Sequence, residues 1–236
     1  MKPIDIQYHY ETEDGQQEHF HIQMDPVRME VISPKRKTLP KWTRLAFHQC
    51  PNCPLTADQH PDCPPAVNMV DLVQRFEDLL SHDMITVTVE ADERRIHTKT
   101  SAQRGVSSLM GLLMAASGCP LTDFFKPMAR FHWPFASVEE TIWRAISTYL
   151  LAQYFHQLDG GKVDVQLTGL SRIYEEIQKV NMAIAKRLRE ACLYDSMVNS
   201  IILLDMFAKS MPDAIGEALA EIEYLFVPYQ RYSPNP

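Results

Sequence analysis

Residues 50–63 read Cys50-Pro-Asn-Cys53-Pro-Leu-Thr-Ala-Asp-Gln-His60-Pro-Asp-Cys63, which sets three thiols and one imidazole at the spacing C-x2-C-x6-H-x2-C. Two cysteines that are two residues apart can turn both sulfurs toward one ion from a tight loop. His60 and Cys63 repeat that two-residue gap. The spacing therefore predicts a metal site at Cys50, Cys53 and Cys63, with His60 as one candidate for the fourth ligand.

A second pattern points to a more distant fourth ligand. Cys50, Cys53, Cys63 and Cys119 are each followed by proline, whereas Cys192 is not. Proline after a ligating cysteine restricts the backbone and removes an N–H group, and a Cys-Pro dipeptide ends the ligand run of bacterial ferredoxins. The pattern makes Cys119 the alternative to His60 and admits either a zinc ion or a [4Fe–4S] cluster. We expect Cys192 to be a core residue.

Other readings of the cysteines explain less of the pattern. They could be ordinary thiols in a proline-rich linker, but unpaired cysteines rarely fall at ligand spacing. The odd total of five cysteines and the lack of an apolar leader favour a reducing, cytoplasmic location over disulfides. A haem bound through a thiolate would need only one Cys-Pro dipeptide. The longest weakly polar run, residues 109–118, is too short for a membrane span of ~20 residues.

Composition and net charge limit the kinds of partner that the protein can bind. The 236 residues are 45% hydrophobic and 22% charged, which is ordinary for a globular protein, and the net charge of −7 makes a nucleic-acid partner improbable. One basic strip over residues 35–44 is the exception, and it could bind RNA or act as a protein-interaction adaptor. The simpler interpretation is that this strip is a solvent-exposed linker. Its cations are Lys35, Arg36, Lys37, Lys41 and Arg44.

The N-terminal residues predict antiparallel strands. Residues 4–10 and 20–24 alternate apolar and polar side chains around an Asp14-Gly15 turn, and residues 29–32 could add a third strand. Residues 84–90 and 95–100 predict a second hairpin. Between the hairpins, the Pro64-Pro65 pair begins a predicted helix that runs to about Leu80 and places Cys63 at its N-terminus.

From residue 101 onward the pattern is helical. A helix of small residues over 101–118 should be deeply buried, end at Gly118 and deliver Cys119 to a fixed position. A capping box at Ser137 begins a helix over 137–157, and further helices are expected over 170–192, over 196–209 and from Pro212 to 226.

These elements predict an α+β protein. An N-terminal part over residues 1–100 would consist of antiparallel β-hairpins with a cysteine-rich metal loop. Residues 101–236 would form an antiparallel helical bundle that packs with the first part as one unit.

One segment suggests an alternative, enzymatic function. Arg130 and His132 lie in a stretch dense in aromatic residues and prolines, and together with Arg104 they could act beside a metal or cluster. The ordinary readings are an ion pair for each arginine and a structural hydrogen bond for the histidine. The signatures of nucleotide-binding, dinucleotide-binding, zinc-protease and α/β-hydrolase sites are absent from the sequence.

The strings Phe47-His-Gln-Cys-Pro-Asn-Cys-Pro-Leu55, Ser117-Gly-Cys-Pro120 and Arg130-Phe-His-Trp-Pro-Phe135 resemble those of an uncharacterised bacterial family of the domain-of-unknown-function kind. The resemblance covers roughly residues 42–226 and implies no activity. The sequence therefore predicts a metal-binding cytoplasmic protein with a structural zinc site or a redox-sensing [4Fe–4S] cluster. The metal-dependent enzyme and the adaptor are its alternatives, and a protein partner is possible.

Overall fold

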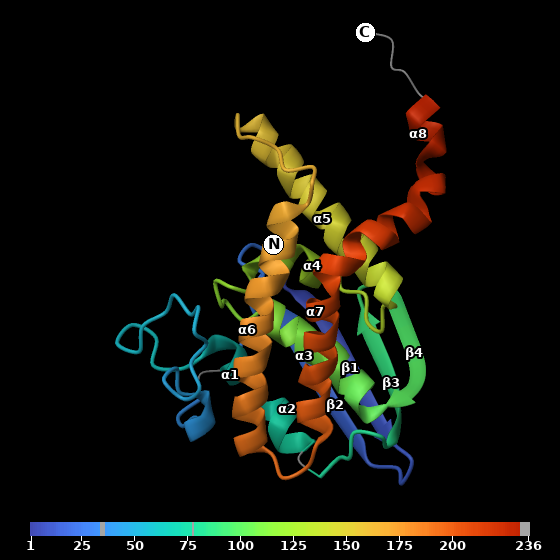
Figure 1. Ribbon diagram of the computed structural model, residues 1–236. Coiled ribbons are helices and arrows are strands. Elements are labelled where there is room, and N and C mark those ends of the chain that lie inside the picture. Colours follow the sequence, from blue (N-terminus) through green and yellow to red (C-terminus); the bar gives the residue numbers. More distant parts are fainter. Residues whose placement is uncertain (34–35, 77, 232–236) are drawn as a thin grey trace.

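The computed structural model describes residues 1–33, 36–76 and 78–231, and Figure 1 shows their arrangement. Four strands form one antiparallel sheet in the order β2-β1-β3-β4. Their bounds are Ile4–Thr12 for β1, Gln17–Met24 for β2, Met84–Ala91 for β3 and Arg94–Ser101 for β4. The fold is α+β, as expected, with short helices between β2 and β3 and the longer helices after β4.

Both predicted hairpins are present, because alternating side chains bury one face of each strand. In β1, for example, Ile6, Tyr8 and Tyr10 are buried while the residues between them are more exposed. The hairpins join through the pairing of β1 with β3. The predicted third strand at residues 29–32 was wrong: this segment contributes only an isolated bridge between Met24 and Val31.

The helix predicted from Pro64 to Leu80 is shorter and interrupted. It consists of α1 (Pro64–Asn68) and α2 (Val70–Arg75), separated at Met69. Met69 and Leu72 are both fully buried. The sequence periodicity was correct for these side chains, but packing of the two short helices decided where the backbone bends.

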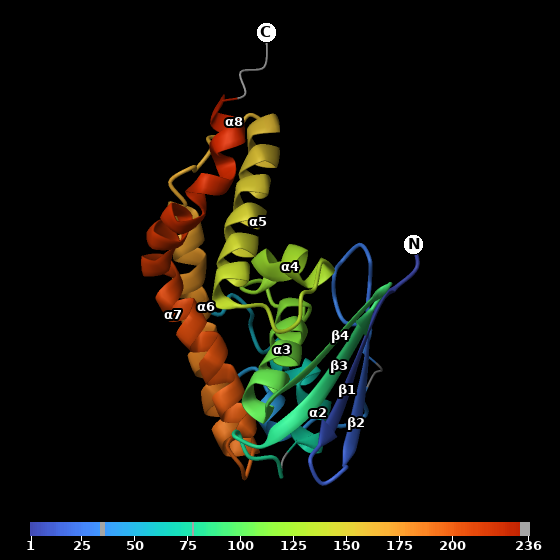
Figure 2. The same ribbon diagram turned by 90° about the vertical axis from the view of Figure 1, so that its right-hand side faces the viewer.

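Helix α3 (Ala102–Ala115) lies between the sheet and the long helices, as Figure 2 shows. Its small residues allow this close approach. A Cβ atom at Gly105 would lie 2.7 Å from Cδ1 of Ile85 on β3. Gly118 has φ of +80°, a conformation that favours glycine, as expected after a helix end. The helix itself ends at Ala115, with Ala116 at the C-cap, so the predicted end was a few residues too late. Cys119 is thereby placed directly beyond the buried helix.

Three long helices complete the structure. They are α5 (Val138–Leu158), α6 (Thr168–Ala191) and α7 (Ser196–Ile222). The predicted break before Pro212 was wrong, because α7 continues through this residue. Met211 and Ile215 are buried on either side of Pro212, so packing carries the helix past the lost backbone hydrogen bond. The shorter elements are η1 (Lys41–Thr43), η2 (Asp123–Phe125), α4 (Lys126–Arg130), η3 (Glu223–Phe226) and α8 (Val227–Arg231).

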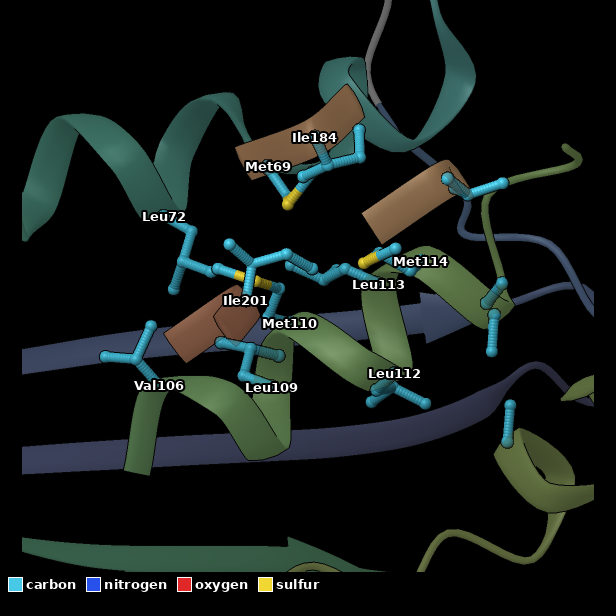
Figure 3. Packing of buried hydrophobic residues seen from close by; sticks show 14 of the residues in the cluster. Met69, Leu72, Val106, Leu109, Met110, Leu112, Leu113, Met114, Ile184 and Ile201 are labelled. Carbon is cyan, nitrogen blue, oxygen red and sulfur yellow. The ribbon is translucent and has the colours of Figure 1, made fainter. Parts of the chain in front are cut away.

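One hydrophobic cluster contains side chains of the sheet, α3, α6 and α7, and Figure 3 shows part of it around Met110 and Ile184. The proposed division of the chain at residue 100 stays a prediction. Among the described residues, no helix has both the length and the apolar character needed to cross a membrane.

Candidate functional site

The first two cysteines lie on a turn that is attached to α6. The backbone N–H of Cys53 donates to the carbonyl of Cys50 at 3.1 Å, which closes the turn. Asn52, at its tip, donates from Nδ2 to the carbonyl of Glu176 at 3.1 Å and to Oε2 of the same residue at 2.7 Å. Both cysteines are partly buried. The turn is therefore oriented by a helix more than 120 residues away in the sequence.

Cys63 and Cys119 are the two buried members of the set. Cys63 precedes the first turn of α1, as predicted, and its N–H donates to the carbonyl of Thr43 at 2.7 Å. The N–H of Cys119 donates to Oγ of Ser117 at 3.2 Å, and its carbonyl accepts from the N–H of Thr122 at 2.9 Å. Backbone hydrogen bonds thus hold both cysteines in position.

The four thiols lie close enough to affect one another's ionisation. Burial raises the pKa of Cys50 to about 12, and the neighbouring Cys63, Cys53 and Cys119 add to that rise. Burial likewise raises the pKa of Cys119 to about 11, with further contributions from Cys63 and Cys53. The structure therefore brings the distant Cys119 to the cysteine loop, and without an ion the thiols of Cys50 and Cys119 would remain protonated at neutral pH.

His60 does not share this environment. Its side chain is exposed and forms no hydrogen bond or ion pair with a described residue. Cys192, which was expected in the core, lies at the end of α6 and packs partly buried against the core.

The four cysteines do not have the arrangement of ligands around one metal ion. Within residues 1–33, 36–76 and 78–231, no three His, Cys, Asp or Glu side chains are arranged so that they could hold a metal ion. A metal centre, its identity and its ligands therefore stay predictions. The proximity of the thiols is a structural fact, whereas their ligation is not.

Arg187 on α6 is the most unusual charged residue beside the cysteines. Its side chain is 1% exposed, and it donates to the carbonyls of Trp42 and Arg44, both at 2.7 Å, and of Leu45 at 2.9 Å. Its Nε has no hydrogen-bond partner among the described atoms. The charge of Arg187 opposes the rise in pKa that burial imposes on Cys63, and it also acts on Cys50.

The sequence analysis missed Arg187, although a signal was present. The residue continues the buried stripe of Ile177, Val180 and Ile184 at helical spacing, so an arginine stands where an apolar side chain is expected. Such a position indicates a specific partner for a buried charge.

The residues of the enzymatic alternative are only partly brought together. Arg104 and His132 line a common pocket, whereas Arg130 does not; its guanidinium lies 5.5 Å from the ring centroid of Phe131. None of the cysteines lines this pocket. The structure thus separates the pocket lining from the four thiols.

His132 is fixed by the sheet. Its Nε2 lies 2.5 Å from the hydroxyl of Tyr8, which is also 2.9 Å from Oγ of Ser108. Burial lowers the pKa of His132 to about 3, and the positive charges of Arg144 and Arg94 act in the same direction. The imidazole is therefore neutral at physiological pH and serves as a hydrogen-bonding group, which is the ordinary reading of this histidine.

The basic strip retains few unpaired charges. Arg36 forms an ion pair with Asp71 at 2.5 Å, and Arg44 lies 3.6 Å from Asp62. Lys35 lies outside the described residues. Lys37 and Lys41 are the only cations of the described part of the strip that lack an ion-pair partner within it or nearby.

The family of the chain follows from its sequence as a whole. A family model described as Domain of unknown function (DUF6901) matches residues 6–227, which include every cysteine and the aromatic segment of the expected resemblance. No curated protein and no solved structure matches the chain. The predicted resemblance to an uncharacterised family is confirmed, and the chain belongs to the DUF6901 family of domains of unknown function.

Proposed function

We propose that the protein binds one metal centre, a zinc ion or a [4Fe–4S] cluster, through the thiolates of Cys50, Cys53, Cys63 and Cys119. The observation that carries this proposal is Arg187. No acidic side chain among the described residues pairs with this buried guanidinium, and its Nε lacks an acceptor. A buried cation without a negative partner is costly, and thiolates are the anions that its neighbours can supply.

The charges of such a centre suit this environment. Four thiolates carry four negative charges, so either a Zn²⁺ ion or a [4Fe–4S]²⁺ core leaves a net charge of about −2 on the site. The positive charge of Arg187 offsets part of it. The backbone N–H groups of Leu121 and Thr122 lower the pKa of Cys119, although burial raises it more, and the N–H of Ala66 acts similarly on Cys63. These groups would stabilise thiolates.

Ligation would require a local rearrangement. Bonds of ~2.3 Å to one zinc ion would draw the four sulfurs together around the ion. Because burial raises the thiol pKa values, binding must also displace protons. The centre would then tie the cysteine loop to the end of α3. Its role would be structural for zinc, or redox sensing for a cluster.

Elemental analysis of the purified protein and of serine variants tests the proposal. We expect about one zinc, or about four iron and four sulfide with brown colour under anaerobic preparation, per chain. Each of Cys50→Ser, Cys53→Ser, Cys63→Ser and Cys119→Ser should lose most of the metal. The matched controls are Cys192→Ser and His60→Ala, which should retain it.

Two results would contradict the proposal. One is full metal content in all four serine variants. The other is an apoprotein that takes up neither zinc nor a reconstituted cluster and melts at the same temperature as before. Loss of metal in His60→Ala with retention in Cys119→Ser would move the fourth ligand to His60.

The two alternative functions have weaker support. A metal-dependent enzyme would have to connect the four thiols with a pocket that none of them lines. An RNA-binding or protein-interaction adaptor would have to use a strip in which Arg36 and Arg44 are already paired. Both therefore rank below the metal-binding role.

A further inference from the structure

A pocket of about 290 Å³ lies between α3, α4, α5, α6 and α7, away from the cysteine loop. Much of its wall is apolar, including Leu112, Phe125, Met128 and Phe207. Since one water molecule occupies about 30 Å³ of the liquid, the space corresponds to roughly ten water-sized groups. It lies at the small end of pockets that bind organic ligands.

Arg144 gives this apolar pocket a positive end. Its Nη2 donates to the carbonyls of Met128 at 2.8 Å and of Phe131 at 3.1 Å, so the guanidinium is held in one orientation. Among the described residues, Nε and Nη1 have no partner, and Arg144 forms no ion pair. Burial lowers its pKa, which shows that the charge is partly withdrawn from water.

Among the residues that the structure describes, no acid forms an ion pair with this guanidinium. Glu140 is the acidic residue that acts on Arg144, but its Oε2 accepts the N–H of Ser137 at 2.7 Å in the capping box of α5. The carboxylate is thus committed to the helix start. A partly buried guanidinium whose Nε and Nη1 still carry free N–H groups can donate to a carboxylate brought by a ligand.

Tyr174 lies beside this guanidinium. Burial raises the pKa of its hydroxyl, and the charge of Arg144 lowers it, so the two groups are neighbours. The hydroxyl has no hydrogen-bond partner among the residues that the structure describes. The Tyr174 ring makes edge contacts with Phe125 and Phe207, at centroid distances of 5.5 and 5.9 Å. One side chain therefore joins the polar end to the apolar wall.

We propose that this pocket binds a small organic acid, whose carboxylate accepts hydrogen bonds from Arg144 and Tyr174 and whose apolar body lies against Leu112, Phe125 and Phe207. Arg104 lines the same pocket and donates only one long bond, to the carbonyl of Phe135 at 3.5 Å, so it can add positive charge at the edge. No cysteine lines the pocket, so the acid and the proposed metal would be held by different side chains.

Calorimetric titration of the full chain with octanoate tests the inference, with 1-octanol as the uncharged analogue. We expect octanoate to bind at least about tenfold more tightly than 1-octanol, because only the acid can accept charge-assisted hydrogen bonds. Affinity should rise about threefold to fourfold for each methylene from butanoate to octanoate if the body is buried. Arg144→Gln should lose about tenfold or more for octanoate and little for 1-octanol.

Matched variants separate binding from folding. Arg104→Gln removes a charge at the pocket with only one weak contact and should weaken octanoate by a few-fold. Arg130→Gln lies outside the pocket and should have no effect. Equal binding of octanoate and 1-octanol by the unaltered protein, or no binding of either, would overturn the inference even if Arg144→Gln failed to fold.

Discussion

The cysteine loop, residues 41–63, and the hairpin of α6 and α7 are ordered by different means. The loop contains only the three-residue helix η1 as a regular element. Its backbone groups bond mainly to one another, as in the bonds from Leu45 N–H to the carbonyl of Pro61 and from Cys63 N–H to that of Thr43. Side chains of other elements attach it to the rest of the protein. Arg187 alone binds three of its carbonyls. The two helices instead bury apolar stripes that include Ile184, Leu188 and Ile201.

The contrast shows where each region obtains its stability. The helices satisfy their own backbone and gain from apolar burial, so they depend on few individual contacts. The loop has little apolar pattern of its own, and its order depends on groups supplied by α6 and, under our proposal, by an ion. Changes to those groups should therefore loosen the loop first.

Removal of the proposed metal should produce the largest difference between the two regions. We expect chelation to reduce hydrogen-exchange protection over residues 41–63 by about a thousandfold, equivalent to about 4 kcal/mol, because ligation would order this loop. Protection in α6 and α7 should change far less. Exchange measured by mass spectrometry before and after chelation, with zinc added back as the control, checks this expectation. A uniform loss, or none at all after proven metal removal, would contradict it.

Arg187→Met should destabilise the loop by roughly 3 kcal/mol, because the carbonyls of Trp42, Arg44 and Leu45 would lose a charged donor inside the protein. Methionine keeps much of the volume of the side chain. Urea denaturation and exchange over residues 41–63 measure the effect. Arg189→Met, an exposed change two positions further along α6, is the control and should stay within about 0.5 kcal/mol of the unaltered protein. Equal effects of both variants would show that Arg187 does not specifically stabilise the loop.

Mild acid should act outside both regions, through His132, which lies between α4 and α5 and contacts Tyr8 on β1. The folded protein holds the pKa of His132 at about 3, below its ordinary value of 6.5. The unfolded chain therefore binds this proton first, and the free energy of unfolding should fall as the pH drops from 6.5 toward 3, at up to about 1.4 kcal/mol per pH unit. Between pH 7 and pH 5 the loss should be about 2 kcal/mol.

Comparison with His132→Gln isolates this contribution, since glutamine can still bond Tyr8 but takes up no proton. The variant should lose about 2 kcal/mol less than the unaltered protein over the same interval, as measured by urea denaturation at both pH values. His156→Gln, on the exposed end of α5, is the matched control for replacing a histidine by glutamine. An identical pH dependence in His132→Gln would show that other groups cause the acid sensitivity.

Ser137→Ala should have the smallest effect. Oγ of Ser137 accepts the N–H of Glu140 at 3.1 Å, and the alanine variant loses this bond at the start of α5. We expect a loss of about 1 kcal/mol, confined to α5, without a change in the loop. Thermal denaturation measures it against Ser147→Ala, a change inside the same helix at a residue with no such capping role, which should be neutral or slightly stabilising. A larger effect on the cysteine loop than on α5 would mean that the two regions are coupled.

Several features were determined by the sequence alone, because their causes lie within a few residues. Alternating side chains around Asp14-Gly15 specified the first hairpin, and the residues from Ser137 to Glu140 specified the start of α5. Gly118 marked the end of the buried helix, since a positive φ favours glycine. The periodicity also identified many buried positions, but it misplaced helix boundaries at Met69 and Pro212, where packing outweighs local preference.

Only the tertiary structure decided which distant groups meet. The sequence left the fourth ligand open between His60 and Cys119, with a slight preference for Cys119 from the Cys-Pro pattern. The fold brought Cys119 near the other thiols and left His60 exposed. It also paired β1 with β3 and placed Arg187 against a loop more than 140 residues earlier. A local pattern reports the type and spacing of the side chains within one segment. These contacts join segments far apart in the sequence, and they form only when the sheet and helices pack against one another.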